Sequence, residues 1–161
     1  MAVWQFKFSL VPVDGISRVH GGDTANLQFY RTLPEGPNLI DDADALNYWD
    51  DPDALRRIAD TVSNFLPEIK SWSPQARMFG EGTYDQIEVW DSDLDCRIDM
   101  RNFSVDFLEN VLELAREYKC KIAIHGSGDL VSPNLQDVLA EIKKSNAYQF
   151  CLDPRGYLNG L

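Results

Sequence analysis

The sequence predicts an α+β domain, because segments with a helical period alternate along the chain with segments of period two. Three stripes of apolar residues spaced three and four apart indicate amphipathic helices, and short alternating runs indicate strands. The length of 161 residues, with 44% apolar and 25% charged residues, is typical of one globular domain over 1–161. A chain of this length can bury enough apolar surface to fold without disulfides.

The clearest signals in the N-terminal half are one strand and one helix. Residues 3–11 alternate between apolar and polar side chains, which predicts a half-buried strand, and 27–30 is a shorter strand candidate. Asp51 and Pro52 are typical of an N-cap and a first helical position, and Pro67 is expected to end the helix that they begin.

A hairpin is expected in the middle of the chain, after an aromatic-bearing loop over 70–83. Its strands are predicted at 87–90 and 94–101, separated by the short polar turn Asp91-Ser92-Asp93. The second strand has one apolar face and one fully charged face, which consists of Asp95, Arg97, Asp99 and Arg101. Alternating signs on one strand face favour a ladder of ion pairs with the neighbouring strands.

The C-terminal third is expected to contain two helices and two strands. The helices are predicted at 104–115, with Ser104 as N-cap, and at 132–142. A strand is predicted at 120–125, where Gly126-Ser127-Gly128 ends it, and a last strand at 148–152.

The order of the predicted elements narrows the fold class. The first six strong elements are strand, helix, strand, strand, helix and strand, which is the order of the ferredoxin-like, split βαβ unit. We therefore expect a ferredoxin-like sheet with three helices packed on it, and an extra C-terminal helix and strand.

The formal net charge of −11 excludes some classes of partner. Nucleic acid and anionic membranes need clustered Lys and Arg, so neither is an expected partner, whereas a basic protein is. Three widely spaced cysteines, no apolar run long enough to span a membrane and no signal-peptide pattern predict a cytoplasmic protein.

Two acidic segments that each contain a tryptophan are candidate partner-binding patches. The first comprises Glu81, Asp85, Glu88, Trp90, Asp91 and Asp93, and the second comprises Asp41, Asp42, Asp44, Trp49 and Asp50. An aromatic side chain bordered by acids is typical of a binding hot spot for a basic partner. Packing in the core is the alternative for each tryptophan.

No catalytic, cofactor-binding or metal-binding residues are predicted. Asp91, Asp93 and Asp95 have the spacing of the first calcium ligands of an EF-hand loop, but the central Gly and the closing Glu are missing. The segment 125–129 follows a strand but lacks the nucleophile-elbow and dinucleotide-binding patterns. Two alternatives stay open: a small enzyme that uses His125, Asp129 or Asp99, and a homo-oligomer such as a homodimer.

About a quarter of the chain, within 79–115, carries a resemblance to a known class of proteins. The residues that carry it are Phe79-Gly80-Glu81, Ile87-Glu88-Val89-Trp90, Arg97-Ile98-Asp99-Met100-Arg101-Asn102, Phe107-Leu108 and Leu112-Glu113-Leu114-Ala115. This stretch resembles small bacterial immunity proteins encoded beside polymorphic or contact-dependent growth-inhibition toxins. The resemblance implies a cytosolic protein that binds a cognate toxin, often a nuclease with a basic cleft, and blocks its active site.

Overall fold

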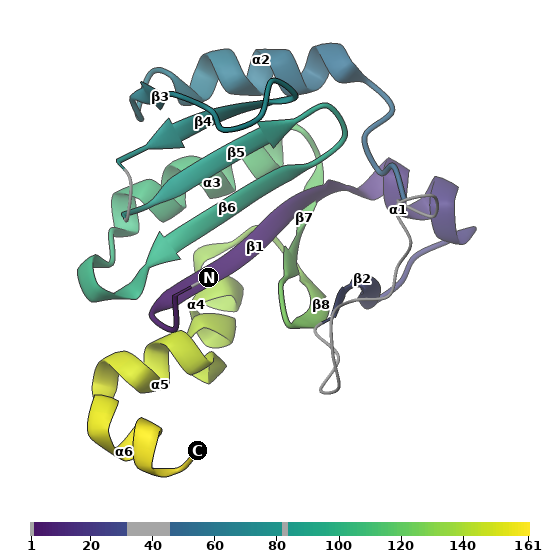
Figure 1. Cartoon of the computed structure of the whole chain (residues 1–161). Coiled ribbons are helices and arrows are strands. Elements are labelled where there is room, and N and C mark those ends of the chain that lie inside the picture. The colour runs from purple at the N-terminus through teal and green to yellow at the C-terminus, as the bar shows by residue number, and fades with distance from the viewer. Residues whose placement is uncertain (1, 32–45, 82–83) are drawn as a thin grey trace.

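A single antiparallel sheet organises the chain, and it confirms the α+β class (Figure 1). The structure is a computed structural model that describes residues 2–31, 46–81 and 84–161. Among these residues, eight strands pair in the order β2-β8-β7-β1-β6-β5-β4-β3. The strands are β1 (Gln5–Pro12), β2 (Asn26–Arg31), β3 (Glu68–Ile69), β4 (Ala76–Gly80), β5 (Gln86–Trp90), β6 (Leu94–Asp99), β7 (Cys120–Ile124) and β8 (Ser127–Val131).

The helices lie before, between and after these strands. The described residues form α1 (Val13–His20), α2 (Pro52–Val62), the 3-10 helix η2 (Met100–Asn102), α3 (Val105–Glu117), α4 (Leu135–Lys144), α5 (Asn146–Leu152) and α6 (Pro154–Asn159). In Figure 1, α2 lies beside β4 and β3 at one end of the molecule, and α5 and α6 lie at the opposite end.

The main hydrophobic core lies between one face of the sheet and the helices α2, α3 and α4. Alternation along β1 turns Phe6, Phe8 and Leu10 toward this core, where they join the apolar stripes of the three helices. The predicted N-caps of two of these helices are confirmed. Asp51 accepts hydrogen bonds from the backbone of residues 53 and 54, and the Ser104 hydroxyl accepts one from that of residue 107.

The opposite face of the sheet is covered only in part. A smaller apolar cluster joins Val11 of β1, Ile16 of α1, Leu27 of β2 and Tyr48. Along β1, Lys7 and Ser9 lie on this face, because they alternate with the residues that enter the main core. The predicted hairpin is confirmed as β5 and β6, and Arg97 and Asp95 of β6 lie opposite Lys7 and Ser9 of β1. The second strand is shorter than predicted, because β6 ends at Asp99 and Arg101 lies in η2.

The predicted last strand is wrong, because residues 146–152 form the helix α5. The Ser145 hydroxyl accepts a hydrogen bond from the Tyr148 N–H and caps this helix. The alternation of Tyr148, Phe150 and Leu152 does not mark a buried strand face, since Leu152 is exposed. Ala147 and Phe150 instead share one helical face, and the Phe150 ring packs near that of Trp4.

Three other segments also differ from the sequence-based expectations. Residues 13–20 form α1, which no pattern predicted, and the expected loop over 70–83 contains β4. Gly126 does follow the end of β7, but it forms a tight turn rather than an open loop, and Ser127 and Gly128 already belong to β8. Gly128, with a φ of 74°, is required there, because a Cβ atom would lie 2.4 Å from the backbone oxygen of Leu27.

None of the helices in the described part of the chain is both long and apolar enough to cross a membrane.

Candidate functional site

A pair of tryptophans, the exposed Trp72 and the half-buried Trp90, lies at one corner of the sheet, next to α2. Trp72 is 75% exposed and packs edge-on against Trp90 of β5, with ring centroids 5.3 Å apart. Asp91, the next residue, is exposed and has no ion pair or hydrogen bond within the described residues. We call Trp72, Trp90 and Asp91 the tryptophan corner.

Neighbouring charges hold Trp90 in place at this corner. Its indole Nε1 donates a hydrogen bond to Glu88 Oε2 at 3.2 Å, and the other oxygen of Glu88 accepts one from Arg97 at 2.9 Å. The position of Trp90 is therefore fixed before any partner binds, which reduces the entropy that a binding event costs. A hollow of about 170 Å³ adjoins the corner and is lined partly by Trp90, Asp91 and residues of α2.

The other residues of the first predicted patch do not gather around Trp90. Asp85 accepts a hydrogen bond from the Asp99 N–H, and burial raises the pKa of its carboxyl group. Glu81 is exposed near Asp85, beside a different hollow. Asp93 turns away from Trp90 toward the partly covered face of the sheet, where it contacts Tyr30. Of the six predicted residues, only Glu88, Trp90 and Asp91 belong to the corner region.

The prediction that Trp49 is the exposed aromatic residue of the second patch is wrong. This side chain is 5% exposed in the main core, and its indole N–H donates to the Leu10 carbonyl oxygen at 3.1 Å. Trp49 is therefore not an exposed anchor, and core packing was the correct alternative. Asp50 is exposed and pairs with Arg18 at 3.7 Å. The predicted residues Asp41, Asp42 and Asp44 lie outside the described residues.

A second group of polar side chains lies at the centre of the sheet, where Ser9 and Tyr30 are buried and Asp93, Asp95 and His125 are half-buried. The Ser9 hydroxyl lies 2.5 Å from Asp95 Oδ1 and 2.7 Å from His125 Nε2. Asp95 also pairs with Lys7 at 3.5 Å, and the Tyr30 hydroxyl donates to Asp93 at 3.2 Å. We call Ser9, Tyr30, Asp93, Asp95 and His125 the polar cluster.

Strand register explains why these residues meet. Ser9 lies directly opposite Asp95 of β6 and opposite Ala123 of β7. Residues opposite each other across an antiparallel pair have side chains on the same face, so Ser9 and Asp95 are neighbours. His125 lies two residues beyond Ala123 and reaches Ser9 along the same face.

Burial sets the protonation of the polar cluster. It lowers the pKa of His125 to about 4, although the charge of Asp95 acts in the opposite direction. Burial and, to a smaller extent, the nearby charge of Asp95 together raise the pKa of Asp93 to about 7. At pH 5 to 6 the cluster therefore holds a proton on the Asp93 carboxyl group, while the imidazole is neutral.

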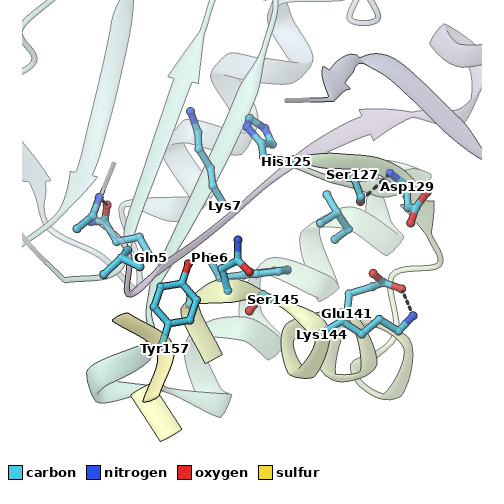
Figure 2. A pocket seen from close by; sticks show the side chains of 16 residues that line it. Gln5, Phe6, Lys7, His125, Ser127, Asp129, Glu141, Lys144, Ser145 and Tyr157 are labelled. Atoms are coloured by element: carbon cyan, nitrogen blue, oxygen red, sulfur yellow. Dashed lines mark hydrogen bonds and ion pairs between the residues drawn. The ribbon is translucent and has the colours of Figure 1, made fainter. Parts of the chain in front are cut away.

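His125 also lines a pocket whose wall is formed by residues of β1, β7 and the C-terminal helices (Figure 2). The pocket has a volume of about 630 Å³, which is within the range of small-molecule sites. Figure 2 shows Ser127 and Asp129 on the side of His125, and the Glu141–Lys144 pair of α4 and Tyr157 of α6 at other parts of the wall. We call it the His125 pocket.

The contacts of Ser9, Asp99 and the two histidines can be compared with those that an enzyme would need. The carboxylate of Asp95 contacts the serine rather than the far nitrogen of the imidazole, and Ser9 is 0% exposed, so the arrangement differs from a Ser-His-Asp triad. Asp99 is buried and held by two hydrogen bonds from the Arg101 guanidinium group. His20 contacts Tyr48 and does not join His125.

The residues of the described part of the chain form no group of three or more side chains suited to holding a metal ion.

The His125 pocket was not predicted from the sequence, although His125 and Asp129 were singled out as an alternative. Ser9 left a weak signal, as a small polar residue on the polar face of a predicted strand. Tyr30 left none, because its neighbours come from distant strands.

Comparison of the chain with protein-family models, with curated proteins and with solved structures finds no match.

Proposed function

We propose that this protein binds a basic partner protein at the tryptophan corner, and that it neutralises a toxin domain as immunity proteins do. The observation that carries the proposal is the exposure of Trp72. Tryptophan is rarely left 75% exposed, and it is among the residues most enriched in binding hot spots. The resemblance within residues 79–115 supports the immunity role, since β5 with Trp90 lies within that stretch.

The charge of the chain supports a basic partner. The net charge of −11 attracts a basic domain from a distance and raises the rate of association. Asp91 has no ion pair within the described residues, so its carboxylate can pair with a partner's Lys or Arg without breaking an internal contact. A nuclease domain with a basic cleft is the partner class that we propose.

A binding experiment with the neighbouring gene product tests this function. The proposal expects a secreted toxin to be encoded beside this gene; the probe is the C-terminal domain of that toxin, and its affinity is measured by calorimetry. We expect Trp72→Ala to weaken binding at least 30-fold, which corresponds to about 2 kcal/mol. Leu158→Ala removes another exposed apolar side chain, in α6 at the opposite end of the molecule, and is expected to leave the affinity unchanged.

Kinetics and growth assays complete the test. The association rate is expected to fall steeply as the salt concentration rises, and Asp91→Asn is expected to reduce that salt dependence. Co-expression with the toxin domain should permit growth for the native chain and not for Trp72→Ala. Failure of the native chain to bind or to protect would refute the proposed function, whereas equal binding by Trp72→Ala would refute only the site.

We also infer that the centre of the sheet is a ferredoxin-like core. The support is the chain order β1, α2, β5, β6, α3, β7, in which four strands and two helices follow the split βαβ order. β3 and β4 interrupt this order between α2 and β5, and β2 and β8 extend the sheet beyond β7.

A further inference from the structure

The hollow beside the tryptophan corner lies between α2 and the strands β4 and β5, and we call it the α2 hollow. Its floor is apolar, because the buried residues Leu55 and Ala59 of α2 and Val89 of β5 all contribute to its lining. The volume of about 170 Å³ is smaller than that of whole small-molecule sites, which are roughly 300–1,000 Å³. The α2 hollow therefore suits a single side chain rather than a complete small molecule.

Gln75 and Asp91 lie next to each other on the rim of the α2 hollow. Ala76 of β4 pairs with Trp90 of β5 in an antiparallel register, which brings Gln75, the residue before Ala76, opposite Asp91, the residue after Trp90. Both Gln75 and Asp91 are exposed, and both line the hollow. Residues opposite each other have Cβ atoms about 4.5–5.5 Å apart, so a charge at one position can interact with the other.

The charges around the α2 hollow favour a cation. Arg77 donates to Glu68 at 2.9 Å and to Asp60 at 3.1 Å, and Arg56 pairs at 2.7 Å with the carboxylate three residues before it in α2. These two arginines that line the hollow thus face three carboxylates, and Asp91 adds a fourth. Asp91 has no ion pair or hydrogen bond in the part of the chain that the structure describes, so its charge is free to pair with a cation from outside.

We propose that the α2 hollow receives one long basic side chain, whose methylene groups contact the apolar floor and whose charge pairs with Asp91. Lysine and arginine share this chemistry, because each carries a cation at the end of an aliphatic stem. The cation stays at the exposed rim while the stem is buried, so the contact avoids most of the cost of desolvating a charge. This inference rests on the proposed function in one respect, namely that the basic partner supplies the side chain.

Titrations followed by nuclear magnetic resonance test the α2 hollow without the partner. The probes are Nα-acetyl-lysine amide and Nα-acetyl-arginine amide at pH 7 and constant ionic strength, and the signals followed are the backbone amides of Val89 and Asp91. We expect both basic probes to shift these signals. Nα-acetyl-norleucine amide has a carbon chain but no charge, and it is expected to leave them unchanged. The basic probe that binds more tightly identifies the preferred side chain.

Two variants at the exposed rim make the test specific. Asp91→Asn removes the unpaired charge and should weaken binding of the basic probes about tenfold. Gln75→Lys places a cation opposite Asp91 within the chain, and this internal competitor should weaken their binding about threefold. The matched control is Gln136→Lys, which makes the same change at an exposed position of α4, a helix that does not line the hollow, and should leave binding unchanged.

The same variants separate this contact from the proposed function. Gln75→Lys should also weaken binding of the toxin domain, whereas Gln136→Lys should not. The inference is overturned if neither basic probe binds, if the norleucine probe binds equally well, or if Gln75→Lys binds the basic probes or the toxin domain as the native chain does. If the basic probes bind but the toxin domain does not, the proposed function is refuted, while the site for a basic side chain stands.

Discussion

Trp90 and Asp93 flank the same two-residue turn between β5 and β6, yet they belong to regions of opposite character. The Trp90 N–H donates to the Asp93 carbonyl oxygen at 2.8 Å, so the two residues have a fixed relation to each other. Trp90 turns toward the exposed Trp72, whereas Asp93 turns toward the buried Tyr30. The tryptophan corner leaves apolar surface and a free carboxylate in solvent, while the polar cluster provides a partner for each half-buried charge.

This difference shows which region contributes to folding and which is available for binding. A buried charge without a partner costs several kcal/mol, so each member of the polar cluster depends on the others. An exposed tryptophan has no such dependence, because its removal leaves no cavity in the core. Substitutions in the two regions should therefore differ in their effects on stability and on its pH dependence.

The largest expected effect is that of Asp93→Asn on the pH dependence of stability. Asp93 has a raised pKa in the folded state, so its contribution to stability is present at pH 4 and is lost as the pH rises to about 7. Asparagine keeps the shape and does not titrate. Relative to the native chain, the variant should gain roughly 3–4 kcal/mol in free energy of unfolding between pH 4 and pH 8. Urea titrations at each pH measure this difference, and a constant difference contradicts the raised pKa.

His125→Gln should have an effect of opposite sign and somewhat smaller size. The pKa of His125 is lowered to about 4, so its contribution to stability is present above pH 6.5 and is lost as the pH falls toward 4. Relative to the native chain, the variant should lose roughly 2–3 kcal/mol as the pH rises from 4 to 7. His20→Gln, which alters the exposed histidine of α1, is measured alongside as the matched control for the loss of an imidazole.

These two variants together test the transfer of one proton within the polar cluster. At pH 5 to 6 the unfolded chain carries the proton on the imidazole, and the folded chain carries it on Asp93. The folded and unfolded chains then bind the same number of protons, so Asp93 and His125 together add almost no pH dependence to the stability of the native chain in that range. The free energy of unfolding becomes pH-dependent there only when one of the two residues is replaced.

Ser9→Ala should destabilise the protein by about 2 kcal/mol, because the loss of the hydroxyl leaves the Asp95 carboxylate and the His125 Nε2–H each without this partner. Thermal and urea unfolding at pH 7 measure the change. Ser17→Ala, at an exposed position of α1, serves as the control and should change stability by less than about 0.5 kcal/mol. An equally small change for Ser9→Ala would show that the contacts of the hydroxyl contribute little to folding.

The smallest effect is expected at the tryptophan corner. Trp72→Ala should change the free energy of unfolding by no more than about 0.5 kcal/mol, because Trp72 is 75% exposed. Trp49→Ala is the contrasting variant, since it removes a core side chain and should cost about 3–5 kcal/mol. Urea unfolding of the two variants compares the tryptophans directly, and a large loss at Trp72 would mean that the corner is part of the core.

The sequence by itself determined most of the local elements. The caps at Asp51 and Ser104, the apolar stripes of three helices and the alternation in β1, β5, β6 and β7 depend on residues close together in the chain. Helix signals are reliable where a cap and a stripe agree. The alternation over 148–152 misled because it lacked other support, and Ser145 caps a helix there instead.

Only the tertiary structure decided which side chains meet. The residue Ser9 reaches Asp95 and His125 because β1 pairs with β6 on one side and with β7 on the other, and strand order is not encoded in local periodicity. The packing of distant segments also explains why two of the tryptophans differ in exposure. Trp49 and Trp90 have similar acidic neighbours in the sequence, but Trp49 lies in the core, whereas Trp90 is half-buried beside the exposed Trp72. Burial depends on how distant segments pack, so composition around a residue cannot predict it.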